Sequence, residues 1–324
     1  MSSRESAPLF RVEAGPPLPD GTAEWIEARS RRRLRAAFFE PKSSPRGSVV
    51  LSPGRTEPIE KYGEVASDLL ARGFAVLIHD WAGQGLSHRF QEDRLRGDVE
   101  GGPQAFLSDY GDVVAAFARR LPRPWIAMGH SMGGGLTALA LSELDVRFDG
   151  AALCAPMMEF SAGKLPIPVA DFIVGAVVRG GFGERLPRAQ TALSEVPFEA
   201  NVLTHDRARY ERMLSLYRAH PELCIGEPTW RWLRFGLDLR RSLASPAVAE
   251  RIAIPTLVVA AGDDRVVHNA PIRSFGARLP QGIFYELAGA FHEIMMELDE
   301  YRARFFEYFD ELAATVVAAR QRRG

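Results

Sequence analysis

The sequence predicts an α/β fold in which a mostly parallel sheet is flanked by helices, with a helical segment inserted between two strands. Short runs that are apolar at nearly every position recur along the chain, as expected for parallel strands covered on both faces. Segments with helical periodicity lie between these runs and return the chain to the start of the next strand. One interval, residues 157–251, contains no strand-like run and offers helical pieces instead.

Taken in order, the chain first predicts an antiparallel hairpin, with strands at residues 25–29 and 34–39 joined by a charged turn. Parallel strands are expected at residues 48–51, 74–78, 125–128, 151–154, 256–260 and 283–287. Helices are expected at residues 59–72, 103–120, 132–144, 169–178, 207–219 and 299–320. This order divides the chain into a core, residues 1–156 and 252–324, and a helical cap (lid) segment, residues 157–251.

Composition and charge argue against several classes of function. The 324 residues are 46% hydrophobic and 25% charged, which is typical of a globular protein in water. The formal net charge is -1, so no global field would recruit nucleic acid or an anionic bilayer. The first residues lack the apolar core of a signal peptide, and no run is long enough to span a bilayer. We therefore expect a cytoplasmic protein that binds no nucleic acid and makes at most transient contact with the inner membrane face.

The two cysteines, Cys154 and Cys224, lie far apart in the sequence and lack the spacing of metal ligands. Cys154 stands in an apolar run and is expected to be a small buried residue. The cysteines therefore predict neither a disulfide framework nor a metal site.

A serine stands between an expected strand and an expected helix, in the sequence Gly129-His130-Ser131-Met132-Gly133. The match to Gly-x-Ser-x-Gly is weak by itself, but a strand before it and a small-residue helix after it are the context of a nucleophile elbow. The sharp turn strains the serine backbone, and the flanking glycines remove side chains that would collide with it. Ser131 is therefore the candidate nucleophile.

A serine nucleophile needs a histidine to accept its proton and an acid to orient that histidine. His292 alone of the seven histidines lies downstream of the last expected strand. Asp264 follows the strand at residues 256–260, and its neighbour Asp263 is a rival; either could instead cap the following helix. The order nucleophile, acid, histidine along the chain favours Asp264 and His292 as partners of Ser131.

Three other histidines have expected roles that differ from that of His292 or compete with it. His268 lies close to the two aspartates and is the competing base. His130, beside the serine, is expected to pack or hydrogen-bond locally, because its side chain points away from the elbow. His79 lies on an expected strand and is expected to be structural.

Two backbone amides are the candidate donors to an oxyanion. The geometry of the elbow supplies the amide of Met132. The loop after residues 48–51 supplies the second, and we choose Arg55 because Pro53-Gly54 lets the backbone approach a ligand closely. A Pro-Gly pair also marks ordinary turns, so that alternative stays open. This chemistry requires no metal and no organic cofactor.

With these residues the chain resembles the α/β-hydrolase superfamily, and within it the monoacylglycerol lipase and bacterial lysophospholipase group of serine hydrolases. The resemblance covers about residues 33–304. The matching core pieces are Pro53-Gly54-Arg55 with Tyr62, Gly73-Phe74, Asp80-Trp81-Ala82-Gly83-Gln84-Gly85-Leu86-Ser87, the elbow with Gly134, Asp264-Arg265-Val266-Val267 and His292-Glu293-Ile294-Met295-Met296-Glu297. The matching cap pieces are Asn201-Val202-Leu203-Thr204-His205-Asp206 with Arg209-Tyr210, and Gly226-Glu227-Pro228-Thr229-Trp230.

The chain departs from the group's pattern at two places. Pro53-Gly54 stands where His-Gly is usual, which keeps the backbone amide and should spare the oxyanion hole. Residues 80–83 stand where Asp-x-Arg-Gly is usual, and Ala82 removes an arginine, so we expect altered anchoring of this loop.

The resemblance implies hydrolysis of a small-molecule carboxylic ester through an acyl-enzyme, with a single-chain lipid ester, a lysophospholipid or a monoacylglycerol, as substrate. The cap segment is expected to decide the substrate. Phe172 and Ile173 lie in a run that is apolar on nearly every side and should be buried, and together with Trp230 they are candidate substrate contacts. Simple packing on the core is the alternative for each of them.

Three other functions stay open. A small-ester carboxylesterase would prefer acetyl or butyryl esters. A proline-iminopeptidase-like peptidase would need a cap carboxylate for the amino terminus of its substrate, and the candidates are Glu159, Asp171, Glu184 and Glu195. A non-catalytic ligand-binding member of the fold would be expected to have lost one of the three candidate catalytic residues, and all three are present.

Overall fold

The computed structural model describes residues 5–160, 166–188 and 196–322. Within them, nine strands form one sheet in the order β1-β2-β3-β5-β4-β6-β7-β8-β9. The strands are β1 Ser6–Ala7, β2 Thr22–Glu27, β3 Arg33–Phe39, β4 Gly47–Ser52, β5 Phe74–His79, β6 Trp125–His130, β7 Gly150–Cys154, β8 Thr256–Ala261 and β9 Gly282–Leu287. The first three strands are antiparallel, β3 pairs antiparallel with β5, and every pair from β5 to β9 is parallel. The expected hairpin and parallel strands are confirmed, and β1 is an addition.

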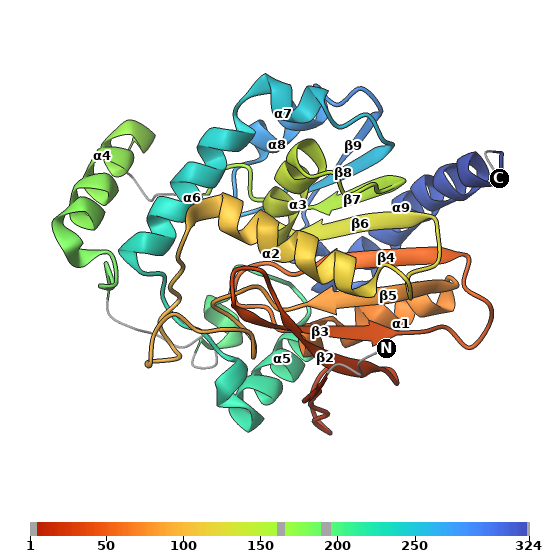
Figure 1. The fold of residues 1–324 in the computed structure, drawn as a ribbon, viewed down its shortest axis with the longest axis horizontal. Coiled ribbons are helices and arrows are strands. Elements are labelled where there is room, and N and C mark those ends of the chain that lie inside the picture. Colours follow the sequence, from red (N-terminus) through yellow and green to blue (C-terminus); the bar gives the residue numbers. More distant parts are fainter. Residues whose placement is uncertain (1–4, 161–165, 189–195, 323–324) are drawn as a thin grey trace.

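Helices cover both faces of the sheet (Figure 1). They are α1 Gly63–Ala71, α2 Gly102–Phe117, α3 Ser131–Glu143, α8 Asn269–Gly276 and α9 Asp299–Gln321. Of these, α2, α3 and α8 share one apolar core with the sheet, while α1 and α9 share the other. Alternate residues of β6 point into opposite cores, since Ile126 and Met128 face α1 and α9 whereas Ala127 faces α2 and α3. This is why the central strands are apolar throughout.

One helix begins later than the sequence predicts. The helix predicted to begin at residue 59 begins instead at Gly63, as α1. The residues before it form the short 3₁₀-helix η1 Ile59–Tyr62. Cys154, at the end of β7, is fully buried as expected.

Between β7 and β8 the described residues of the cap segment form helices only: α4 Ile167–Val177, the π-helical turn η2 Val178–Phe182, η4 Phe198–Ala200, α5 Arg207–Ala219, η5 Pro221–Leu223, α6 Trp230–Leu243 and α7 Pro246–Glu250. Helix α6 packs on α2 and α3 and thereby on the core. Helix α4 contacts α6 and η2 and stands at the edge of the molecule (Figure 1). Helix α6 is therefore one of the elements that join the cap segment to the core.

The expectation that the apolar run of α4 is buried is wrong. Phe172 is 72% exposed and Ile173 is 37% exposed, whereas Ala170 and Val174 are buried. The physical reason is that, among the described residues, α4 packs chiefly against α6 and η2, so side chains on its other face are left exposed. No described helix is both long and apolar enough to cross a membrane.

Candidate active site

Ser131 lies where β6 meets α3. Its φ is 50°, a value that residues with a side chain rarely adopt. A Cβ atom added to Gly133 would lie 2.2 Å from the backbone oxygen of Ser52, and one added to Gly129 would lie 2.7 Å from that of Gly133. Only glycine fits at these two positions, because Gly133 packs against the backbone of Ser52 and Pro53 and Gly129 packs against the first turns of α3. The serine hydroxyl is thereby held at the start of α3, where the first amides lack partners within the helix.

The imidazole of His292, in the loop between β9 and α9, lies between two partners. Its Nε2 is 2.9 Å from Oγ of Ser131, and its Nδ1 is 2.7 Å from Oδ2 of Asp264. The three residues follow β6, β8 and β9, whose carboxyl ends meet at one edge of the sheet because these strands run parallel. A hydroxyl, an imidazole and a carboxylate in this order can pass the serine proton to the imidazole while the carboxylate fixes its orientation.

One of the two neighbouring aspartates reaches His292. The side chain of Asp264 is fully buried, whereas Asp263 is exposed. Burial by itself would raise the pKa of Asp264, but the hydrogen bond and charge of His292 and the amides of Val266 and Val267 lower that pKa overall. The Asp264 carboxylate therefore keeps its negative charge beside the imidazole.

The other histidines considered from the sequence lie elsewhere. His268 is exposed just before α8. His79 is buried on β5, and burial lowers its pKa to about 3, so its ring is neutral at ordinary pH. Nδ1 of His130 is 3.1 Å from Oε2 of Glu57, so this ring turns away from Ser131 as expected.

The loop after β4 passes directly beside Ser131. A Cβ atom on Gly54 would lie 3.0 Å from Cβ of Ser131. The amide of Gly54 donates to Oε2 of Glu57, whereas the next amide, that of Arg55, has no hydrogen-bond acceptor among the described residues. The Arg55 amide is thus available to donate to an oxyanion at Ser131.

Two side chains from the loop after β5 hold the loop after β4 in place. The indole of Trp81 donates to the carbonyl of Pro53 at 2.8 Å, and the amide of Gln84 donates to the carbonyl of Gly54 at 2.7 Å. Fixed donors are what an oxyanion site needs, because they require no reorganisation during the reaction.

A cluster of buried charged side chains adjoins the loop after β4. Oε2 of Glu57 accepts from the hydroxyl of Tyr62 at 2.5 Å, while Nζ of Lys61 lies 2.9 Å from Oε1 of Glu57 and 2.5 Å from Oε1 of Glu293. Burial opposes the charge of Glu57, but His130 and Lys61 lower its pKa well below the usual range. Burial also opposes the charge of His130, and Glu57 raises the pKa of His130 overall.

Sequence reasoning missed this cluster, although Glu57 and Lys61 stand four residues apart beside the quoted Tyr62. The cluster joins the loop after β4, the residue before Ser131 and the loop that carries His292.

The family model described as serine aminopeptidase, S33 (Hydrolase_4), matches residues 43–299 of this chain. The chain belongs to this family. Lysophospholipase L2 of Escherichia coli is 34% identical over 274 residues, which cover 79% of this chain and 76% of that protein. The monoacylglycerol lipase of Mycolicibacterium smegmatis is 27% identical over 271 residues, which cover 83% and 89%. The chain is thus a serine hydrolase of the lysophospholipase and monoglyceride lipase group.

Solved structures share the fold of this hydrolase. A soluble variant of the monoglyceride lipase from Saccharomyces cerevisiae, in complex with a substrate analog, superposes with a TM-score of 0.70 at 14% identity and covers 95% of this chain and 100% of its own. The monoacylglycerol lipase of Paleococcus ferrophilus gives a TM-score of 0.66 at 20% identity and covers 87% and 98%. The α/β-hydrolase fold predicted from the sequence is confirmed.

In this hydrolase, the loop that lacks an arginine at residue 82 is anchored from β3. Nε of Arg35 lies 2.7 Å from Oδ2 of Asp80, and its two terminal nitrogens bind the two oxygens of Glu60 at 2.7 and 2.8 Å. All three side chains are buried. A guanidinium from a neighbouring strand therefore neutralises Asp80, so the loop stays anchored although Ala82 supplies no charge.

The cap piece Gly226–Trp230 attaches the cap segment to the loop before α2. The amide of Gly226 donates to the carbonyl of Leu95 at 2.6 Å, and the hydroxyl of Thr229 donates to Oδ1 of Asp98 at 2.7 Å. Arg231 also pairs with Asp98. Thr229 is, in addition, the N-cap of α6, so this attachment fixes the helix that carries the cap segment.

The three candidate substrate contacts differ in burial. Phe172 and Ile173 are exposed on α4, while Trp230 is half-buried at the start of α6, where its amide donates to the carbonyl of Arg185 at 3.0 Å. The aromatic residues that follow Trp230 pack inward. The guanidinium of Arg55 lies 5.0 Å from the ring centre of Trp232, and Phe235 contacts Phe106 of α2 with ring centres 4.8 Å apart.

The described cap carboxylates that a peptidase could use to bind the amino terminus of its substrate are paired with arginines. Glu159 binds Arg240, and Glu184 lies 3.3 Å from Arg231. Asp171 binds Arg234 at 2.8 Å and Arg241 at 2.9 Å. Glu195 lies outside the described residues. Among the residues that are described, no group of three or more histidine, cysteine or acidic side chains could hold a metal ion.

Proposed function

We propose that this protein hydrolyses carboxylic esters through an acyl-enzyme on Ser131. The observation that carries the proposal is the placement of His292 between Ser131 and Asp264, at 2.9 and 2.7 Å. The serine oxygen attacks the ester carbonyl and His292 takes the serine proton. His292 then gives that proton to the leaving alcohol. A water molecule, deprotonated by His292, attacks the acyl group, and the returning proton restores Ser131.

The amides of Met132 and Arg55 are the proposed donors to the oxyanion. Three arguments support them: the position of Met132 at the start of α3, the acceptor-free amide of Arg55 and the close approach of Gly54 to Ser131. Donors fixed in advance act where charge develops in the transition state. No metal or organic cofactor takes part in these steps.

We propose a single-chain lipid ester as substrate, a lysophospholipid first and a monoacylglycerol second. The support comes from the relatives, because a lysophospholipase L2 is 34% identical and a monoacylglycerol lipase 27% identical. In this proposal, residues 1–156 and 252–324 form the catalytic core, and residues 157–251 form a cap that selects the substrate.

We further propose a cytoplasmic protein whose helix α4 makes transient contact with a lipid surface. Three apolar side chains of α4 and η2, Val169, Phe172 and Phe182, are 44%, 72% and 48% exposed. The basic residues Arg179 and Arg185 are exposed close by. Apolar side chains beside arginines suit the boundary between headgroups and acyl chains of an anionic membrane.

Two assays test the proposal. A fluorophosphonate probe should label the purified protein, and Ser131→Ala should abolish both labelling and p-nitrophenyl ester turnover. Full activity in that variant would rule out Ser131 as nucleophile, and a wild type that is never labelled would indicate a binding protein. A panel of substrates then identifies the substrate class. Highest activity on long-chain lysophospholipids supports the lipid assignment, whereas highest activity on acetyl or butyryl esters indicates a carboxylesterase. Cleavage of amino-terminal peptide substrates indicates a peptidase.

A further inference from the structure

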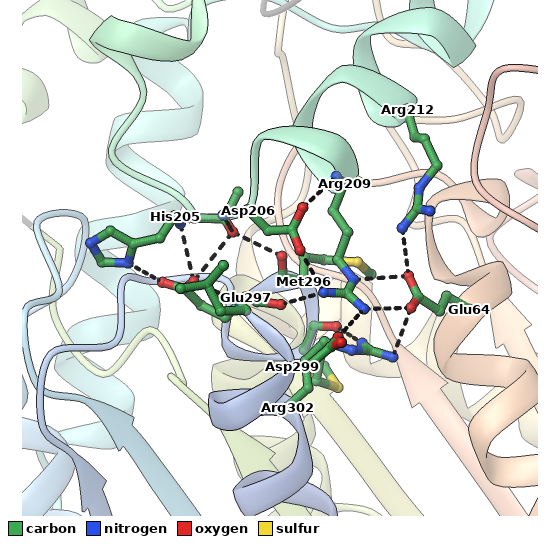
Figure 2. A network of polar contacts seen from close by, with 12 residues as sticks. Glu64, His205, Asp206, Arg209, Arg212, Met296, Glu297, Asp299 and Arg302 are labelled. Atoms are coloured by element: carbon green, nitrogen blue, oxygen red, sulfur yellow. Dashed lines mark hydrogen bonds and ion pairs between the residues drawn. The ribbon is translucent and has the colours of Figure 1, made fainter.

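The cap piece around residues 201–209 contacts the loop that carries His292, and Figure 2 shows His205 and Asp206 beside Met296 and Glu297. It is joined to that loop by Glu297, whose carboxylate is fully buried. Oε1 of Glu297 accepts the amide of Phe291 at 2.8 Å and lies 2.7 Å from Nδ1 of His205. Oε2 of Glu297 accepts the amides of His205 at 3.0 Å and Leu298 at 2.9 Å. One carboxylate thus binds donors from the cap segment and from the histidine loop together.

The backbone on both sides of His292 is fixed by these contacts. On the amino-terminal side, the Phe291 amide donates to Glu297. On the carboxyl-terminal side, the amide of Glu293 donates to the carbonyl of Leu203 at 2.8 Å. Since Leu203 belongs to the cap segment, the cap holds one side of the catalytic-histidine loop directly and the other side through Glu297.

Two further contacts from the cap strengthen this connection. The hydroxyl of Thr204, which is 1% exposed, donates to the carbonyl of Met296 at 2.8 Å. The ring of His205 stacks on the ring of Phe291, with centres 3.7 Å apart and planes at 30°. The contacts reach the residue directly before His292. Thr204 and Glu297 are buried, where hydrogen bonds to a charged group are strongest, while the ring of His205 is partly exposed.

Ion pairs hold the cap piece itself against the core (Figure 2). Arg209 binds Oε1 of Glu64 at 2.7 Å and Oδ1 of Asp299 at 2.6 Å, and it donates to the carbonyl of Glu297 at 2.8 Å. Arg212 adds a contact to Oε2 of Glu64 at 3.0 Å. The cap piece therefore has a firm attachment to α1 and α9 from which it can fix the histidine loop.

Resting on the proposed function, we propose that Glu297, together with Thr204 and His205 of the cap segment, is a positioning residue that sets the reach of His292 to Ser131. The cap motif thus acts on the reaction through the backbone of the histidine loop and not through substrate contact. A displacement of about 1 Å in a reacting group can cost about 10²-fold in rate, so a loosened loop should lower kcat.

Glu297→Gln is the first test, because glutamine keeps the shape but places an NH₂ group against the N–H donors that the carboxylate accepts. With p-nitrophenyl butyrate and active sites counted by fluorophosphonate titration, kcat should fall about 10- to 100-fold while KM changes less than about threefold. The far-downfield proton resonance of the His292–Asp264 hydrogen bond should also shift or disappear. Arg212→Gln, which alters the same ion-pair group without touching the histidine loop, should keep kcat within about twofold.

Variants on the cap side keep the proposal open to refutation if Glu297→Gln does not fold. Thr204→Val and His205→Phe, the second of which keeps a ring against Phe291, should each lower kcat with little change in KM. A change in KM alone would assign these residues to substrate binding. A loss of thermal stability with unchanged kcat and resonance would assign them a purely structural role. If the wild-type protein is active, either result overturns the positioning inference. A wild-type protein without activity would instead refute the proposed function.

Discussion

Oδ2 of Asp264 lies 2.7 Å from Nδ1 of His292 inside the protein, while the preceding Asp263 is exposed. The neighbouring carboxylates have different environments because the turn after β8 directs one side chain inward and the other into solvent. Oδ1 of Asp264 also accepts the amides of Val266 and Val267 at 2.8 and 2.9 Å, which holds the inward side chain in place.

We expect Asp264→Asn to lower kcat about 10⁴-fold, because an amide would favour the wrong tautomer of His292 and could not stabilise the imidazolium, whereas Asp263→Asn should stay within about twofold of wild type. Steady-state hydrolysis of a p-nitrophenyl ester measures both. Equal losses in the two variants would contradict the assignment.

Removal of the Lys61 charge should destabilise the protein by about 3–5 kcal/mol, because it leaves the carboxylates of Glu57 and Glu293 buried without their shared cation. Lys61→Met tests this by urea unfolding. Adding Glu293→Gln should recover part of the loss, since one of the unpaired charges is then removed. Losses that simply add would argue against a buried charged cluster in which the three side chains are coupled.

The buried His79 should make the protein less stable in acid. Its folded pKa is about 3, below the ordinary value of 6.5, so between these values the unfolded chain binds the proton and the free energy of unfolding falls as pH falls. The slope from this one residue is about 1.4 kcal/mol per pH unit. His130, whose pKa is raised, has the opposite effect, because the stabilisation that it contributes is present at low pH and is lost as pH rises above 6.5.

Urea unfolding at pH 6.5 and pH 5 should therefore show a smaller loss in His79→Gln than in the wild type. The comparison uses the difference between the two pH values, so the fixed cost of repacking around the substituted side chain cancels. An identical pH dependence in both proteins would mean that His79 titrates normally in the folded state.

Phe172→Ser should weaken binding to anionic phospholipid vesicles about tenfold or more, because a buried phenylalanine side chain contributes about 1.5–3 kcal/mol. Hydrolysis of long-chain lysophospholipid in vesicles should fall with it, and hydrolysis of dissolved p-nitrophenyl butyrate should not. Ile283→Ser, on β9, is the matched control because Ile283 is 40% exposed and lies outside the cap segment. Vesicle sedimentation checks the binding, and equal effects of the two variants would contradict a lipid contact specific to α4.

Local patterns were sufficient for the sheet and for the elbow. Apolar runs predicted the parallel strands because both faces of a central strand are covered. Gly129 and Gly133 predicted the turn because a side chain at either position would collide with neighbouring backbone. The order of Ser131, Asp264 and His292 along the chain favoured these three residues, and they meet because parallel strands place their carboxyl ends at one edge.

The pairing of Arg35 with Asp80, and the attachment of Glu297 to Thr204 and His205, join residues 45 to 93 positions apart, and no local pattern reports such contacts. The exposure of Phe172 depends on which neighbours α4 has, and apolar composition alone predicted the opposite.

The sequence by itself thus determined the sheet, the strained turn at Ser131 and the chain order of the three candidate catalytic residues, because steric limits and burial periodicity act over a few residues. Tertiary structure alone decided that Asp264 and not Asp263 faces His292, and that a cap motif holds the histidine loop, because these depend on where distant backbone segments meet.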